Sequence, residues 1–266
     1  MTRRLLILAA VAVLVLLMGL PLVVVFFEAF SHGLPKAWAA ITDPDAVSAI
    51  QLTLLVAAIS VAVNTVGGLA AAWCITRFQF RGRGLLLTLI ELPFSLSPII
   101  SGLVWVLLFG AQGWFGPAMQ RAGVQVIFAL PGLVLATLLV TFPFVMRPLI
   151  PLMQRQGADE EDAALTLGAS GWQAFCRVTL PNVRWALLQG VLMCNARAMG
   201  EFGAVSVVSG HVRGETNTMP LHIEVLYNDF NVPAAFAVAS LLAMLGLVTL
   251  AAKLLLERQG GRFIPA

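Results

Sequence analysis

Six long apolar segments run through this 266-residue chain and restrict its fold more than any other feature. Their approximate ranges are 5–27, 52–75, 85–109, 126–146, 185–209 and 234–256. Crossing a hydrocarbon core takes roughly 20 apolar residues as a helix, and lipid offers the backbone no other hydrogen-bond partner. The runs lack the alternation of a membrane β-barrel. The sequence therefore predicts an all-α polytopic membrane protein of six transmembrane helices, forming a single domain over 1–266.

The composition agrees with this class and excludes others. Hydrophobic residues make up 59% of the chain and charged residues 11%, against about 25% charged in soluble domains. The net charge is +3, and the charged residues form no patch. We therefore expect the protein to lie in a lipid bilayer and to bind no nucleic acid. The three cysteines show no metal or disulfide spacing. The first segment is too long for a signal peptide, and no cleavage site follows it, so we expect it to be retained.

Positive charge is distributed unequally between the two sides of the predicted bundle. Lys36, Arg121 and Arg213 fall on one side, and Arg197 lies inside the fifth segment. The remaining twelve of the sixteen cations fall on the other side if the segments alternate in direction: Arg3, Arg4, Arg77, Arg81, Arg83, Arg147, Arg155, Arg177, Arg184, Lys253, Arg258 and Arg262. Because cytoplasmic loops carry the excess of Lys and Arg, both termini and the loop 159–181 are predicted to be cytoplasmic.

The loop 159–181 is a polar passage between the fourth and fifth segments. Its four acidic residues 159–162 favour a helix start, and Gly168 can end that helix. Ser170 can cap a second short helix, and Pro181 is expected at a turn into the fifth segment. From the residues alone, this helix pair either packs on its own bundle or receives another protein.

The loop also carries a known spacing. The residues D-A-A-x3-G-x9-V-x-L-P resemble the E-A-A-x3-G-x9-I-x-L-P coupling loop of ABC importer permeases, with Asp162 in place of Glu. Further on, N-A-R-A-x-G-E-F-G-A-V-S-V-V-S-G-x-x-R-G-E-T resembles the sulfate/thiosulfate ABC importer permeases and looks closest to their W-type subunit. Molybdate permeases share the loop and are the near neighbour.

The resemblance implies a type I ABC importer permease-like fold and a set of partners. These are a paralogous T-type permease subunit, a homodimeric cytoplasmic ABC ATPase and a periplasmic sulfate/thiosulfate-binding protein. ATP and Mg would then bind to the ATPase, with no cofactor in this chain, which has no Walker-type motif. The ATPase-coupling residues by this resemblance are Asp162, Ala163, Ala164, Gly168, Val178, Leu180 and Pro181.

Charges within the apolar segments indicate a pathway or a gate, because a charged side chain is costly at bilayer depth. Arg197 and Glu201 lie four residues apart on one helical face. They either help an anion across and hold a gate, or they neutralise each other and fix a helix packing. Ser206 and Ser209, among glycines, are further pathway candidates. Arg147 is expected at the membrane interface.

Glu91, close to Pro93 and Pro98, is a second pathway candidate. Proline bends helices, so the third segment is predicted to be kinked near its cytoplasmic third. Glu91 either lines a gate there or is a paired or snorkelling residue. On the outer side, Arg213, Glu215 and Thr216 are expected to dock the binding protein, and the nearby histidines match no metal-site pattern.

These observations together predict a permease subunit of a bacterial inner-membrane importer of sulfate or thiosulfate that works by alternating access. A translocator rather than an enzyme is expected. The alternatives are a molybdate or tungstate ABC permease and, with less support, a stand-alone secondary anion carrier. No internal inverted repeat favours the carrier, and Glu91, Arg197 and Glu201 match no reaction that would indicate a membrane enzyme.

Overall fold

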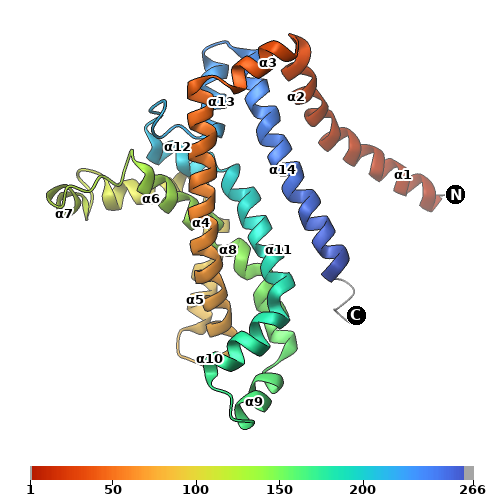
Figure 1. The fold of residues 1–266 in the computed structure, drawn as a ribbon, viewed down its shortest axis with the longest axis vertical. Helices are drawn as coiled ribbons and strands as arrows, with labels where there is room; N and C mark the ends of the chain where they lie inside the picture. Colours follow the sequence, from red (N-terminus) through yellow and green to blue (C-terminus); the bar gives the residue numbers. More distant parts are fainter. Residues whose placement is uncertain (1, 261–266) are drawn as a thin grey trace.

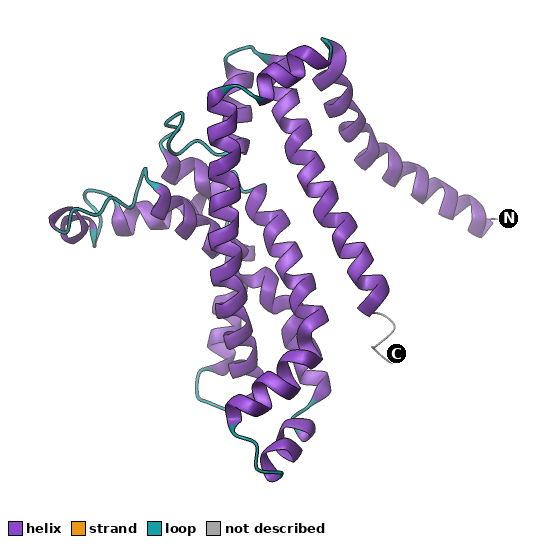
Figure 2. Ribbon diagram, in the orientation of Figure 1, coloured by secondary structure: helices purple, strands orange, loops and turns teal. Residues whose placement is uncertain are grey.

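A computed structural model describes residues 2–260, and every regular element within them is a helix (Figure 2), which confirms the all-α prediction. The first half contains α1 (Thr2–Leu14), the π-helix η1 (Val15–Gly19), α2 (Leu20–Ser31), α3 (Leu34–Ile41), α4 (Pro44–Arg77), α5 (Arg83–Ser95), α6 (Pro98–Phe109) and α7 (Gly116–Arg121). The second half contains α8 (Leu130–Gln156), α9 (Asp159–Thr166), α10 (Gly171–Ala174), the π-helix η2 (Phe175–Thr179), α11 (Leu180–Met199), α12 (Gly203–Ser209), α13 (Met219–Asn228) and α14 (Val232–Gly260).

The helices provide six membrane-spanning segments. Four are continuous and apolar over their length: Arg3–Ser31, Pro44–Arg77, Leu130–Gln156 and Val232–Leu256. Two more are bent pairs, with 111° between α5 and α6 and 51° between the Gly171–Met199 helix and α12. The predicted number of six is confirmed when each bent pair counts as one span. The expectation that the third and fifth spans are single helices is wrong.

The break in the third span follows from its prolines. Leu96 and Ser97 have extended backbone conformations between α5 and α6, and Pro98 begins the new helix. A residue before proline is disfavoured in the helical conformation. The predicted kink is therefore a complete break in the helix.

Helix α8 shows the opposite behaviour, because it passes through three prolines without ending. The segment was expected to end near Met146, but the helix continues past Pro143, Pro148 and Pro151 to Gln156. Neighbouring helices stabilise proline-containing spans when they approach closely. Gly190 of α11 provides such an approach, since a Cβ atom there would lie 2.9 Å from the Val145 carbonyl oxygen.

The core of the bundle is formed by α4, α8 and α11, which pack side by side, with α14 against α11 and α2 against α14 (Figure 1). Buried Asn64 of α4 ties the three core helices together: its amide donates to the Thr141 hydroxyl at 2.8 Å and contacts the Cys194 sulfur at 3.8 Å. Polar contacts of this kind hold helices together in lipid.

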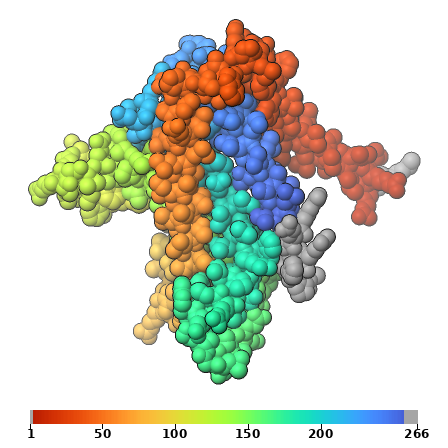
Figure 3. Space-filling view, in the orientation of Figure 1, coloured from red at the N-terminus to blue at the C-terminus, as the bar shows by residue number. Residues whose placement is uncertain are grey.

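Helix α1 leads away from the bundle and exposes its apolar side chains (Figure 3). Arg262 of the predicted charge pattern lies outside the described residues.

Candidate coupling surface and translocation residues

The loop 159–181 forms two short helices at one end of the bundle (Figure 1). Four acidic residues occupy the first turn of α9, as predicted. Gly168 follows the helix with φ +91°, and its N–H donates to the Leu165 carbonyl while Ala169 N–H donates to Ala164. This pair of bonds is a Schellman motif, in which the residue with positive φ is usually glycine. Ser170 and Gln173 form a capping box on α10, so the predicted cap is confirmed.

The passage from α10 into α11 differs from the prediction. No turn lies at Pro181, because α10, η2 and α11 form one continuous helix. Proline lacks the N–H that an α-helix needs for its i−4 bond. The π-helical turn η2, in which Leu180 N–H donates to the Phe175 carbonyl, changes the bonding pattern just before Pro181. A stiff helix therefore connects the loop to the fifth span.

An ion pair attaches α9 to the end of the second span. The Arg77 guanidinium lies 2.8 Å from the Glu161 carboxylate, and each side chain is 12% exposed. The Thr179 hydroxyl of η2 donates to the same carboxylate, and Arg77 also donates to the Gly157 carbonyl. One carboxylate thus joins α4, α9 and η2. Sequence reasoning missed this site, because Arg77 and Glu161 are 84 residues apart and each looks like an ordinary charge at a membrane boundary.

Aromatic side chains reinforce the same junction. The Trp73 ring of α4 meets the Phe175 ring edge-on, with centroids 5.2 Å apart, and Phe175 stacks on Trp172 of α10 at 5.6 Å. Edge-on and stacked pairs are favourable beyond the area that they bury. The helix pair is therefore fixed to α4 as well as to α11.

The outer face of this helix pair is exposed and partly apolar. Leu167 is 88% exposed and Trp172 74% exposed. Asp162 and Ala163 of the predicted motif are exposed beside them, as are Gly168 and Pro181, whereas Ala164, Val178 and Leu180 are half-buried. A rigid element with an exposed apolar face is suited to receive another protein and to transmit its displacement.

The two breaks in the third and fifth spans meet each other. A Cβ atom on Gly203 would lie 2.8 Å from the Pro98 Cβ, and one on Gly102 would lie 2.6 Å from the Ala204 carbonyl oxygen. Small residues thus allow α6 and α12 to pack closely. Predicted pathway residues Pro93 and Pro98 flank one break, and Glu91 lies on α5 with an exposed side chain.

Arg197 and Glu201 form the ion pair that their spacing predicts. The two groups are 2.6 Å apart, with side-chain exposures of 32% and 0%. The Glu201 carboxylate also accepts the Ala204 N–H at 2.9 Å, so it bridges the break between α11 and α12. Ser206 donates its hydroxyl to the Gly203 carbonyl inside α12. The contacts are those of a pair that fixes a helix junction, and the role of these residues in a gate stays a prediction.

Ser209 and Thr216 lie next to each other and are buried. Each hydroxyl donates to the other residue's carbonyl at 2.6 Å, which closes the loop between α12 and α13. On the surface of that loop, Arg213 pairs with Asp229 at 2.5 Å, with both side chains about half exposed, and Glu215 is exposed. Of the three predicted docking residues, Arg213 and Glu215 are accessible and Thr216 is not.

Next to this loop, His222 of α13 is buried. Burial lowers the pKa of His222, and this effect outweighs the nearby carboxylates Asp45 and Asp43, which raise it. Among residues 2–260, no three His, Cys, Asp or Glu side chains lie close enough together to hold a metal ion.

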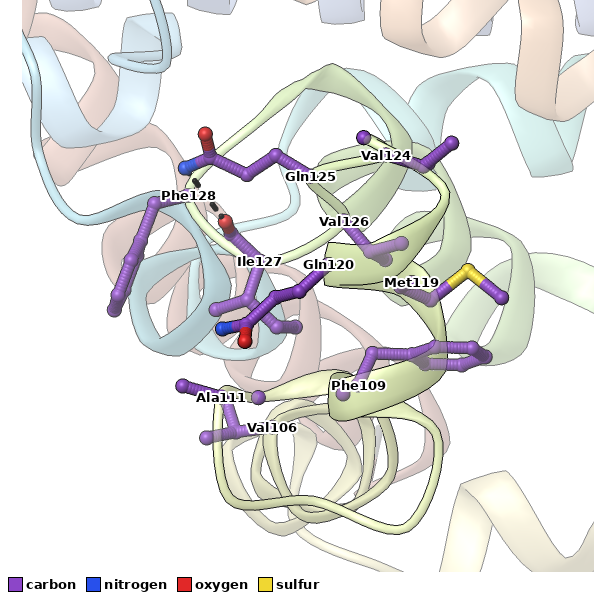
Figure 4. A pocket seen from close by; sticks show the side chains of 13 residues that line it. Val106, Phe109, Ala111, Met119, Gln120, Val124, Gln125, Val126, Ile127 and Phe128 are labelled. Carbon is purple, nitrogen blue, oxygen red and sulfur yellow. Dashed lines mark hydrogen bonds between the residues drawn. The ribbon is translucent and has the colours of Figure 1, made fainter.

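A cavity of about 420 Å³ lies between the end of α6, α7 and the segment 123–128 (Figure 4). Its lining is mostly apolar, and its polar side chains are Gln120 and Gln125, the second of which donates to the Ile127 carbonyl at 3.2 Å. No charged side chain lines it. The cavity therefore offers little to a small anion.

Broken spans that meet inside a helical bundle are a feature of membrane transporters, where interrupted backbone is tolerated next to a pathway. The fold and this site therefore define a transporter component. The chain belongs to the family of binding-protein-dependent transport system inner membrane components, which matches residues 64–259. It is accordingly a multi-pass inner-membrane protein.

Relatives within this family are similar over most of their length. The sulfate transport system permease protein CysW of Escherichia coli (strain K12) is 51% identical over 237 residues, which cover 89% of this chain and 81% of that protein. The sulfate transport system permease protein CysT of the same strain is 36% identical over 247 residues, covering 93% and 89%.

Solved structures show the same fold. A bacterial ABC transporter involved in the import of the acidic polysaccharide alginate matches with a TM-score of 0.77 and 16% identity, over 99% of this chain and 96% of that one. A second structure, the alginate transporter in complex with a periplasmic protein, matches with a TM-score of 0.76 and 17% identity, over 97% and 96%. At such low identity the likeness shows the ABC importer permease fold alone.

Proposed function

We propose that this chain is the permease subunit of an ATP-driven importer of sulfate and its close analogue thiosulfate, working by alternating access. The observation that carries the proposal is the exposed pair α9–α10, held to α4 by Arg77 and Glu161 and continuous with α11. The sulfate permeases to which the chain is similar support the choice of substrate.

In this mechanism, closure of a partner ATPase pushes on the face formed by Asp162, Leu167 and Trp172. The push reaches α4 through the Arg77–Glu161 pair and α11 through η2. The two core helices then move together, because each packs against α8. Movement at the breaks in the third and fifth spans opens the pathway to the other side.

The proposed partners are a T-type permease paralogue, a homodimeric cytoplasmic ATPase that binds ATP and Mg, and a periplasmic sulfate-binding protein. The similarity to both CysW and CysT supports the pairing of two permeases. The structural likeness to an importer in complex with a periplasmic protein is consistent with the last partner. The excess of cations on the α9–α10 side supports cytoplasmic termini.

Uptake of radiolabelled sulfate tests the substrate. The chain is reconstituted with the co-expressed T-type permease, ATPase and binding protein in proteoliposomes loaded with Mg-ATP. We expect uptake that excess unlabelled thiosulfate suppresses and excess molybdate does not. Suppression by molybdate alone would identify a molybdate permease instead.

The docking residues are tested in the same preparation. Arg213 and Glu215 are exposed on the loop between α12 and α13, so replacing both by Ala should weaken capture of the sulfate-loaded binding protein. Unchanged affinity would remove these residues from the docking surface. Lys36→Ala serves as the comparison, because Lys36 is an exposed cation of α3 outside this loop.

A further inference from the structure

Arg147 is a cation of helix α8, which forms the fourth span. Helix α8 continues for nine residues beyond it, so Arg147 lies about 13 Å from the cytoplasmic end of the helix. Nearby Val145 packs against Gly68 and Gly190, which lie within α4 and α11 rather than at their ends. Arg147 is nevertheless exposed on the surface of the chain.

The side chain opens into a cavity between α5 and α8. The cavity measures about 550 Å³, and its lining includes Glu91, Phe94, Ser95, Arg147 and Pro151. The Arg147 guanidinium lies 5.6 Å from the centre of the Phe94 ring, which in turn meets the Phe144 ring edge-on at 5.2 Å. The aromatic pair therefore holds the guanidinium in a defined place at the cavity wall.

The charge of Arg147 is not neutralised in the way that the charge of Arg197 is. Glu201 lies 2.6 Å from Arg197, whereas no carboxylate in the described part of the chain lies within ion-pair distance of Arg147. A guanidinium that faces lipid hydrocarbon is costly. The open cavity beside Arg147 offers room for water or an anion instead.

We infer that Arg147, with the Ser95 hydroxyl, forms an anion-binding subsite for a tetrahedral divalent oxyanion in the cavity between α5 and α8. The inference rests on the proposed function and identifies where the anion is held below the break in the third span. A dianion crossing a low-dielectric region needs a fixed cation, and a hydroxyl adds a hydrogen-bond donor. Glu91, which lines the same cavity from α5, repels the anion and keeps the subsite weak, which favours release.

The first test removes one positive charge from α8 at each of two positions, Arg147 and Arg155, in separate variants. Arg147→Gln should lower the maximal rate of sulfate uptake by roughly tenfold or more, since it removes a fixed charge from the anion's path. Arg147→Lys should retain part of the rate. Arg155→Gln, at the cytoplasmic end of α8 and outside the cavity, should transport as the unchanged chain does. Equal uptake by Arg147→Gln and the unchanged chain would overturn the inference without affecting the proposed function.

The second test does not depend on transport, and its comparison of sulfate with chloride needs only the Ser95→Cys variant. Ser95→Cys is reacted with a charged thiol reagent in proteoliposomes made only of phosphatidylcholine, so that no anionic headgroup is present. We expect sulfate to slow the reaction more than chloride at equal ionic strength, and Arg147→Gln to abolish the difference. Equal rates in sulfate and chloride would overturn the inference. A parallel preparation contains anionic phospholipid; slowing of the reaction in that preparation alone would assign the cavity to a lipid headgroup and would also overturn the inference.

Discussion

Arg77 and Glu161 are 84 residues apart in sequence, yet their charged groups lie 2.8 Å apart and join the second span to the short helix α9. Each of the two side chains is 12% exposed, and the Thr179 hydroxyl donates to the Glu161 carboxylate as well. Force applied to α9 therefore reaches α4 directly.

Removing this connection should uncouple ATP hydrolysis from transport. Arg77→Ala leaves Glu161 without its cation, which costs about 1–3 kcal/mol locally. We expect the ratio of sulfate transported to ATP hydrolysed to fall, while the complex still assembles. The exchange Arg77→Glu with Glu161→Arg should recover part of the ratio. Arg81→Ala, an exposed cation in the adjacent turn, is the control, and an equal loss in that variant would argue against a specific connection.

Gly168 is predicted to be required for the shape of the coupling surface. Its φ of +91° is one that other residues adopt only with strain, at a cost of about 1–2 kcal/mol. Gly168→Val should leave membrane insertion intact and strongly reduce uptake. Gly84→Val is the matched control, because a Cβ atom at either glycine meets open space and only Gly168 has a positive φ. Unimpaired uptake by Gly168→Val would remove the coupling role from this loop.

The Arg197–Glu201 pair makes a prediction about stability. Arg197→Ala leaves a fully buried carboxylate without its cation, and since Arg197 is 32% exposed we expect a loss on the order of 2 kcal/mol rather than the larger loss of a fully buried pair. Adding Glu201→Gln should restore most of the thermal stability of the purified complex, because the amide oxygen can still accept the Ala204 N–H. If Arg197→Ala keeps both stability and transport, neither a structural nor a gating role survives.

His222 predicts a pH dependence of stability. Burial lowers its pKa in the folded protein, so below its ordinary pKa of about 6.5 the unfolded chain takes up a proton that the folded chain does not. Stability should therefore fall as the pH decreases from about 6.5 through the lower folded value. Thermal unfolding in detergent between about pH 7.5 and pH 5.5 measures this, and His222→Gln should show a smaller change. If the thermal stability of His222→Gln changes with pH as much as that of the unchanged chain, His222 is not the group responsible.

Local patterns predicted the segments whose structure depends on their own residues. The apolar lengths predicted six spans, and the acidic turn, Gly168 and Ser170 predicted the two helices of the coupling loop. These features follow from lipid and from capping groups, which act over a few residues.

What the sequence did not predict depends on contacts between distant segments. The contact between the breaks at Ser97 and Gly200 depends on the close approach of α6 and α12, and α8 passes through Pro148 where Gly190 of another helix lies against it. A single sequence does not indicate which of these competing effects prevails.

The most direct test of the central claim is to purify the tagged chain from detergent-solubilised membranes and identify what accompanies it by mass spectrometry. We predict recovery of a second, similar permease and a cytoplasmic ATPase, with the ATPase lost when Leu167 and Trp172 on the exposed face are both replaced by Glu. Recovery of the chain alone, in a form that still transports sulfate after reconstitution without ATP, would contradict the account and identify a secondary carrier.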